Sequence, residues 1–306
     1  MTLANLNGIL PVLPTPFLPE GGVDLTALKS VVSFALECGV NGVVYPGFAS
    51  EVEALTGDER AELLKIVVTT VNGRIPIVAG ASAPTPEQVI GHGRVAMDLG
   101  VNHLMVQPPK ELGAENVAAF MAEVSAGLPG VEIILQNAPA PRGDDLSPQT
   151  ILDILEQVPA VTYVKEETLP AGPAIEHILA NAPAHLKGVI GGGGARYILD
   201  EYQRGACAAM PAIEIADLHV EMDAAWRCGD RAKARDLYVR TLPLLALQAL
   251  YRMRLTKHTL MKRGVITHIG VRAPTPNLDK AAVADIDGNL VELGLIPAVA
   301  LQGAAE

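Results

Sequence analysis

The stretch Val161-Thr162-Tyr163-Val164-Lys165-Glu166-Glu167 is rich in β-branched and aromatic residues, a composition typical of a β-strand. Side chains alternate along a strand, so the residues expected on one face are Val161, Tyr163, Lys165 and Glu167. An ammonium group and a carboxylate therefore point the same way at the end of this strand. If that face lines a pocket, the pair is suited to covalent amine chemistry.

The alternation of a short apolar run with an amphipathic segment extends outward from this stretch in both directions. We expect seven further strands, at residues 8–14, 42–45, 75–79, 103–107, 132–136, 188–190 and 206–210. Helical patterns separate them, for example at residues 25–38, 116–125 and 195–204. Eight strand–helix units predict a parallel sheet with right-handed crossovers, and eight is the number that closes a barrel. We therefore predict a (β/α)8 TIM barrel with residues 161–167 on the sixth strand.

More helix follows the eighth strand than a bare barrel needs. Residues 213–261 are helical in pattern, with breaks expected at Gly229-Asp230 and near Pro243. A chain of 306 residues could form two domains, but single barrels commonly reach this length. We expect one barrel at residues 1–225 and an appended C-terminal helical segment, residues 226–306, packed on it.

The composition argues against several classes of protein. A net charge of −11 without a run of Lys or Arg gives no support for nucleic-acid binding. No segment reaches the ~18 apolar residues that cross a membrane, and the N-terminus lacks a signal-peptide pattern, so we expect a cytoplasmic protein. The three cysteines are widely spaced, which fits reduced thiols, and the seven histidines show no HxH or HxxxH spacing. We expect no metal and no cofactor.

Lys165 is the first candidate for chemistry, because active sites of such barrels lie at the carboxyl ends of the strands. A buried lysine is costly unless it is paired, and burial favours the neutral amine, which can attack a ketone. Lys165 could thus form a Schiff base with a 2-oxo acid, with the iminium as electron sink. The alternative is a solvated lysine, or an ion pair of Lys165 with Glu166 or Glu167.

Four motifs follow one another along the predicted barrel: Pro14-Thr15-Pro16-Phe17, Gly47-x-x-x-Glu51, Asn137-x-Pro139 and Lys165. In this order they resemble the dihydrodipicolinate synthase / N-acetylneuraminate lyase family of class I aldolases, over residues 8–300. The resemblance implies a barrel in which Lys165 forms an imine with pyruvate or a pyruvate-derived 2-oxo acid. It also implies a homo-oligomer, a tetramer or a dimer.

The resemblance points to the loop after the second strand as a binder of the substrate carboxylate, through backbone N–H groups and hydroxyl groups. The loop here is Gly47-Phe48-Ala49-Ser50-Glu51, which lacks the two hydroxyl residues that the family usually carries at its second and third positions. Phe48, Ala49 and Ser50 remain candidate substrate-binding residues. Phe48 could equally be a structural plug.

Three residues near other strand ends are further candidates. Met210 falls where the family places an apolar residue with backbone contact to the substrate. Gly192 belongs to the run Gly191–Gly194, which we expect to make space for the substrate, since no Lys-Ser/Thr follows it as in a phosphate-binding loop. Arg142 could bind the distal end of a sugar acid or be a solvated surface charge.

The proton relay of the family is missing. Its acid/base tyrosine precedes Asn-x-Pro, where this chain has Gln136, and an amide does not titrate near neutral pH. Glu167 is the nearest replacement: it could take the C3 proton of a bound 2-oxo-3-deoxy acid and help expel a C4 hydroxyl. The alternative is a salt bridge of Glu167 to Lys165 or to a neighbouring arginine. The pattern Gln-x-Ala-Pro with Lys-x-Glu-Thr resembles the 2-keto-3-deoxy-L-arabonate dehydratase branch.

These observations leave three hypotheses for the function. The first is a Schiff-base lyase that dehydrates a 2-keto-3-deoxy sugar acid, with Lys165, Glu167 and Gln136 as catalytic residues. The second is a pyruvate-dependent aldolase or an enzyme like 4-hydroxy-tetrahydrodipicolinate synthase. The third is a homologue that binds a 2-oxo acid without turning it over.

Overall fold

The computed structural model describes residues 5–110 and 112–297 of the chain. The chain forms two compact units. Unit 1 contains the residues up to 10, 41–45 and 73–210, and unit 2 contains 11–40, 46–72 and the residues from 211 onward. The expected boundary between residues 225 and 226 stays a prediction, and residues 1–4, 111 and 298–306 of the expected ranges lie outside the described part.

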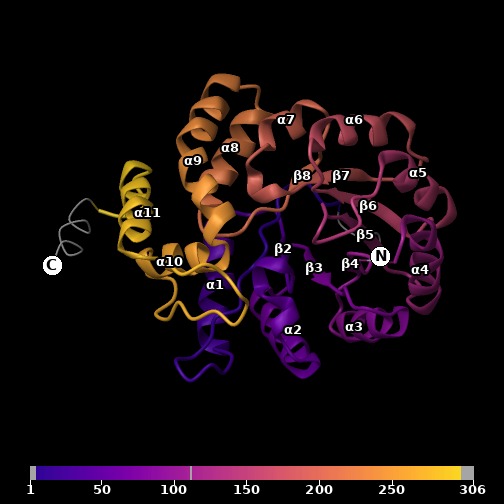
Figure 1. Cartoon of the computed structure of the whole chain (residues 1–306), viewed down its shortest axis with the longest axis horizontal. Coiled ribbons are helices and arrows are strands. Elements are labelled where there is room, and N and C mark those ends of the chain that lie inside the picture. Colours follow the sequence, from indigo (N-terminus) through magenta and orange to yellow (C-terminus); the bar gives the residue numbers. More distant parts are fainter. Residues whose placement is uncertain (1–4, 111, 298–306) are drawn as a thin grey trace. The chain divides into compact units, whose positions relative to one another are not determined.

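Unit 1 is built on one sheet of eight parallel strands (Figure 1). The strands are β1 (Gly8–Ile9), β2 (Val43–Val44), β3 (Ile77–Gly80), β4 (His103–Val106), β5 (Glu132–Asn137), β6 (Val161–Glu166), β7 (Gly188–Gly191) and β8 (Ala208–Ala209). Their order is β1-β8-β7-β6-β5-β4-β3-β2, so each strand lies beside its neighbours in sequence, and β8 lies beside β1. The parallel pairing and this order confirm the predicted (β/α)8 barrel.

The first strand is also tied to the residue that leads into the second strand. The Asn41 N–H donates to the Ile9 carbonyl at 2.9 Å, and the Asn41 Oδ1 accepts from the Ile9 N–H at 2.9 Å. Gly8 makes this contact possible, because a Cβ at that position would lie 2.1 Å from Asn41 Oδ1. Gly8 also has a φ of +70°, in the left-handed region that favours glycine. These two bonds link the end strands β1 and β2.

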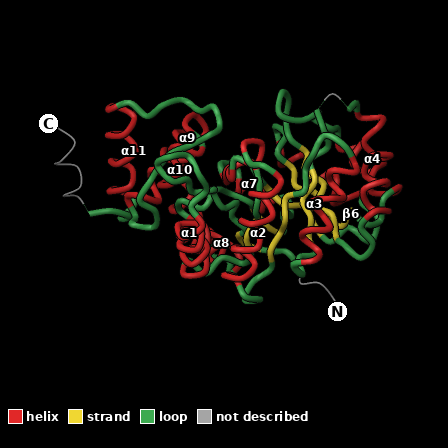
Figure 2. Tube along the Cα trace, turned by 90° about the horizontal axis from the view of Figure 1, so that it is seen from below, coloured by secondary structure: helices red, strands yellow, loops and turns green. Residues whose placement is uncertain are grey.

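Five helices of unit 1 lie between successive strands: α3 (Pro86–Asp98), α4 (Ala114–Gly127), α5 (Pro148–Gln157), α6 (Ala171–Asn181) and α7 (Ile198–Gln203). Figure 2 shows the strands of this unit as one group beside helices α3 and α4. Every residue of β4 and β6 is buried, as expected for parallel strands covered on both faces. The side chain of Ser147 caps α5 by accepting a hydrogen bond from the Thr150 N–H.

Unit 2 is mainly helical. It contains α1 (Leu25–Glu37), α2 (Gly57–Val71), α8 (Ala216–Arg227), α9 (Arg231–Tyr251), α10 (Met253–Lys262) and α11 (Lys280–Glu292). A capping box begins α2, since Thr56 and Glu59 exchange side-chain and backbone hydrogen bonds. No helix among residues 5–110 and 112–297 combines the length and the apolar character that a membrane span requires.

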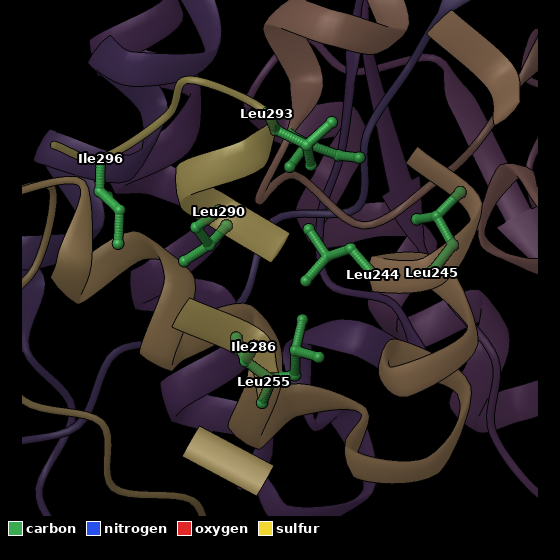
Figure 3. Packing of buried hydrophobic residues seen from close by; sticks show 8 residues of the cluster. Leu244, Leu245, Leu255, Ile286, Leu290, Leu293 and Ile296 are labelled. Atoms are coloured by element: carbon green, nitrogen blue, oxygen red, sulfur yellow. The ribbon is translucent and has the colours of Figure 1, made fainter. Parts of the chain in front are cut away.

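The expected break near Pro243 is wrong, because α9 runs through this residue. A proline removes one hydrogen bond from a helix, but here the next two residues, Leu244 and Leu245, are buried in a shared apolar cluster. In Figure 3 their side chains lie among those of α10 and α11, namely Leu255, Ile286 and Leu290. The helix instead ends at Arg252, whose φ is +49°. The packing of α9 against its neighbours outweighs the local cost of the proline.

Candidate active site

Lys165 and Glu167 lie together at the carboxyl end of β6. The Lys165 Nζ is 2.5 Å from the Glu167 Oε1, and the two residues are only 4% and 8% exposed. Strand alternation predicts this contact, because it places both side chains on one face. Glu166 and Glu167 were both considered as ion-pair partners of Lys165, and the ion pair is formed with Glu167. A buried amine and a buried carboxylate are in direct contact.

Gln136 and Arg142 complete the surroundings of the Glu167 carboxylate. Gln136 stands beside Lys165 in the β5–β6 register, and its Nε2 donates to Glu167 Oε1 at 3.4 Å. The Arg142 Nη2 donates to the other oxygen, Oε2. The backbone of Arg142 is held as well: its N–H donates to the Pro139 carbonyl at 3.0 Å. Both alternatives for Glu167, a salt bridge to Lys165 and one to an arginine, occur together.

These contacts decide the charge of Glu167. Burial raises the pKa of its carboxyl, but the Lys165 ammonium and the Arg142 guanidinium outweigh burial and lower it to about 2. Glu167 is therefore ionised at neutral pH. In this state it can accept a proton, and it has none to donate.

Glu166 points to the opposite side of β6 and has a different set of partners. One carboxylate oxygen accepts from Asn137 Nδ2 at 2.9 Å, and the other accepts from the N–H and the hydroxyl of Thr168 at 2.7 Å and 2.6 Å. Asn137 in turn exchanges two hydrogen bonds with the backbone of Leu146, each at 2.9 Å. Burial raises the pKa of Glu166. The Asn137–Glu166 pair joins the carboxyl ends of β5 and β6 behind the face that carries Lys165.

The glycines after β7 leave room for two glutamates. A Cβ on Gly192 would lie 2.4 Å from Glu167 Cγ, and a Cβ on Gly191 would lie 2.0 Å from Glu201 Oε2. The side chains of Glu167 and Glu201 therefore occupy the room that these two glycines leave, and the space expected here for a substrate stays a prediction. The backbone of the run is also engaged, because the Met210 N–H donates to the Gly191 carbonyl at 3.0 Å. Met210 itself is 3% exposed.

Glu201 is a site-lining residue that the sequence reasoning missed. It lies on α7, is 1% exposed, and shares the buried face of that helix with Ile198, Leu199 and Tyr202. A glutamate within a helical stripe of apolar residues, shortly after a glycine run, is the pattern that could have indicated it. Burial, followed by the negative charge of Glu167, raises the pKa of Glu201 to about 8. Glu201 is therefore an uncharged acid at neutral pH.

The candidate carboxylate-binding loop after β2 belongs to unit 2. Phe48, Ala49 and Ser50 form a single 3-10 turn, η1 (Phe48–Ser50). The Ser50 hydroxyl donates to the Leu13 carbonyl at 2.5 Å and accepts from the Gly47 N–H at 2.8 Å. Its proton thus fixes the turn within unit 2. Phe48 is half-buried, with the Arg252 guanidinium 5.3 Å from its ring centroid.

Glu51, the last residue of the loop motif, is fully engaged within unit 2. Its Oε1 lies 2.6 Å from the Nζ of Lys257, and both side chains are completely buried. Its Oε2 accepts from the backbone N–H groups of Arg272 and Ala273, each at 2.7 Å. Glu51 therefore anchors the loop to α10 and to the segment after it. No group of three or more His, Cys, Asp or Glu in the described ranges is arranged to hold a metal ion.

Comparison with known proteins decides the family. Residues 5–290 match the model of the dihydrodipicolinate synthetase family. The chain belongs to this family. Among the curated relatives, L-2-keto-3-deoxyarabonate dehydratase of Azospirillum brasilense is 29% identical over 286 residues, which cover 92% of each chain. The 4-hydroxy-tetrahydrodipicolinate synthase of Maridesulfovibrio salexigens is 27% identical over 298 residues, covering 95% of this chain and 100% of the relative.

Solved structures of the dihydrodipicolinate synthetase family share the fold. A putative dihydrodipicolinate synthetase from Pseudomonas aeruginosa is 28% identical, with a TM-score of 0.86 over 94% of this chain and 99% of that one. Dihydrodipicolinate synthase from Rhodopseudomonas palustris superposes with a TM-score of 0.88 over 94% of this chain and 97% of that one, at 24% identity. Enzymes of the family are class I aldolases and lyases that act on small molecules and are generally oligomeric. The protein is a lyase of this family.

Proposed function

We propose that this lyase dehydrates a 2-keto-3-deoxy sugar acid through an imine on Lys165. The observation that carries the proposal is the contact between Lys165 and Glu167, with an amide, Gln136, at the position where the resemblance leads one to expect a tyrosine. The pair supplies an amine for the 2-oxo group and a base for the neighbouring carbon. The dehydratase relative from Azospirillum brasilense supports the same reaction type.

The first step joins Lys165 to the substrate. The nitrogen of the amine bonds to C2 of the 2-oxo acid, and the carbonyl oxygen leaves as water. Ammonium and ketone are thereby converted into a protonated imine and one water molecule, with no change in total charge. Glu167, which balanced the ammonium, then faces the iminium instead.

The second step moves the C3 proton to Glu167. The electrons of the C3–H bond form a C2–C3 double bond, and the electrons of the C=N bond return to nitrogen, which gives a neutral enamine. Loss of the iminium charge removes a cation that lowers the pKa of Glu167, so its affinity for a proton rises as the proton arrives. Arg142 keeps the carboxylate oriented through its other oxygen.

The third step expels the C4 hydroxyl. The enamine electrons form a C3–C4 double bond while the C4–O bond breaks, and the hydroxide leaves as water with the proton held by Glu167. The products are a conjugated iminium and an ionised Glu167, and hydrolysis of the iminium returns Lys165. Overall the substrate loses one water. Gln136 has no proton to relay, and its role is to orient the Glu167 oxygen.

Trapping with borohydride tests the covalent step. With pyruvate or a 2-keto-3-deoxy sugar acid, reduction should add the mass of the reduced ligand to the peptide that contains Lys165, and Lys165→Ala should give no adduct. Glu167→Gln should still form the adduct but lose product formation by on the order of 10²–10⁴-fold. Glu156→Gln, an exposed change on α5, is the control and should alter neither. No adduct with any 2-oxo acid would exclude the imine mechanism.

A second candidate is a pyruvate-dependent aldolase or a 4-hydroxy-tetrahydrodipicolinate synthase-like activity, which the full-length relative from Maridesulfovibrio salexigens favours. Both reactions would give the same adduct on Lys165, so the products must be analysed. Cleavage releases pyruvate and an aldehyde, whereas dehydration releases neither. Thermal stabilisation by a 2-oxo acid without any consumption would indicate a binding homologue instead.

We also propose that the protein is a homo-oligomer, a tetramer or a dimer, that works in the cytoplasm. Two large apolar side chains of unit 1 are exposed, Leu169 at 63% and Tyr197 at 40%, which is the kind of surface that subunit contacts cover. Sedimentation equilibrium of the purified protein gives the subunit number. A monomer at micromolar concentration would contradict the oligomer.

A further inference from the structure

No step of the proposed reaction uses Glu201. It is buried on α7 at 1% exposure, and its Oε2 has no hydrogen-bond partner within the described part of the chain. An unpaired oxygen of a buried carboxylate would be costly, whereas an uncharged carboxylic acid is tolerated far better. Packing alone therefore does not explain why a glutamate is buried at this position.

Glu201 and Glu167 pack against two consecutive glycines, Gly191 and Gly192. The Glu201 carboxyl fills the place of a side chain at Gly191 and accepts a hydrogen bond from the Gly192 N–H. Gly192 is the residue against which Glu167 packs, since a Cβ there would collide with Glu167 Cγ. Glu201 thus holds the peptide that forms one wall for the Glu167 side chain.

We propose that Glu201 is a positioning residue of the active site: its buried carboxyl fixes the Gly191–Gly192 peptide against which Glu167 packs. It does so as an uncharged acid, so no second negative charge stands beside Glu167. The inference rests on the proposed function for the role of Glu167. It assigns Glu201 no contact with the substrate and no proton transfer to it.

The charged groups around Glu201 support this. Glu166 and Glu167 face it from β6, and Asp200 lies next to it on α7. From α6, Glu176 pairs with Arg204 at 2.6 Å, and Arg204 also pairs with Asp200 at 3.1 Å, both on an exposed side of the helices. The strands β7 and β8 carry only glycine, alanine, valine and isoleucine. β6 also carries the Lys165 ammonium, which is 2.5 Å from Glu167 Oε1. A charge on Glu201 would add repulsion to Glu167 and raise the pKa of that carboxyl.

Turnover tests the proposal, with two variants that separate charge from packing. Glu201→Gln keeps a carbonyl for the Gly192 N–H and cannot ionise, so it should keep kcat near pH 7 within about 3-fold. Glu201→Leu has no acceptor and should lower kcat by on the order of 10²-fold with little change in KM. Glu156→Gln should leave kcat and KM unchanged.

Two results would overturn the role of Glu201. One is a Glu201→Leu variant that is folded by circular dichroism and retains wild-type kcat. The other is a Glu201→Gln variant that loses kcat as fully as Glu201→Leu, since the amide keeps the acceptor for the Gly192 N–H.

A second measurement is independent of turnover. A carboxyl whose pKa is raised by folding stabilises the protein fully below its unfolded value of about 4.3, and that stabilisation is lost as the pH rises through about 8. The urea midpoint of the wild type should therefore fall relative to Glu201→Gln between pH 5 and pH 8, and the difference should level off above. A constant difference would show that Glu201 is ionised throughout and would refute its role as a neutral acid. Absence of an adduct on Lys165 would instead refute the dehydration mechanism, while the unfolding series still reports on Glu201.

Discussion

At the scale of single residues, the reactivity of Glu167 depends on the two cations that hold its carboxylate. Arg142→Gln removes one of them, so the pKa of Glu167 should rise and the acid limb of the kcat–pH profile should move to higher pH by roughly 1–3 units. Rates from about pH 2.5 to 7 with a 2-keto-3-deoxy sugar acid measure the shift, because a pKa of about 2 raised by this amount falls in that range. Arg240→Gln, at an exposed arginine of α9, is the matched control. A profile that stays in place would mean that Glu167 is not the base.

The sequence predicts some of the contacts around Glu167 but not others. The alternation of side chains along β6 is enough to bring Lys165 and Glu167 together, and the strand count puts Gln136 on the neighbouring strand. Arg142 is 25 residues from Glu167 in the sequence, and its contact depends on the path of the loop after β5. Glu201 reaches the site from a helix, through the room left by Gly191. Such contacts follow from packing across elements, which the alternation of side chains along one strand does not encode.

At the scale of elements, the loop after β2 depends on the buried pair Glu51–Lys257. Lys257→Met leaves a carboxylate buried without its cation, which should cost about 3–5 kcal/mol in the free energy of unfolding. Urea unfolding, followed by circular dichroism, measures it. Lys233→Met, which breaks an exposed pair with Glu221, is the control and should change the midpoint little. Equal effects of both changes would contradict a buried anchor.

The sequence located the elements better than it located their ends. Strand patterns at 8–14 and 206–210 are longer than β1 (Gly8–Ile9) and β8 (Ala208–Ala209), because beyond these strands the pairing continues only as an isolated bridge between Val12 and Ala212. The break expected near Pro243 failed for a different reason: packing of Leu244 and Leu245 holds α9 intact, and the chain turns at Arg252 instead.

At the scale of the whole molecule, the repeated strand–helix cadence was sufficient for the barrel because it requires only the count and order of elements. Only 4% of the residues are aromatic, so the core must be filled by valine, isoleucine, leucine and alanine, which suits parallel strands covered by helices. The division into two units was not visible in the sequence, because unit 2 combines segments from the beginning and the end of the chain.

Closure of the sheet between β1 and the segment before β2 yields a last prediction. Gly8→Ala forces an L residue into a φ of +70° and pushes against Asn41 Oδ1, which accepts from the Ile9 N–H. The strain of about 1–2 kcal/mol and the loss of that hydrogen bond, about 1–3 kcal/mol, should lower the thermal midpoint by several degrees. Gly91→Ala, in open space inside α3, should raise stability by about 0.5–1 kcal/mol and is the matched control.

A double-mutant cycle separates the two parts of that loss. Asn41→Ala alone removes the same hydrogen bond and also makes room for a Cβ at residue 8. The double variant should therefore lose less stability than the sum of the two single variants, by about the energy of the shared bond. Only the strain at φ +70° should remain as the additional cost of alanine at position 8. Strictly additive losses would mean that Gly8 and Asn41 act independently, and that their contact does not link β1 to β2.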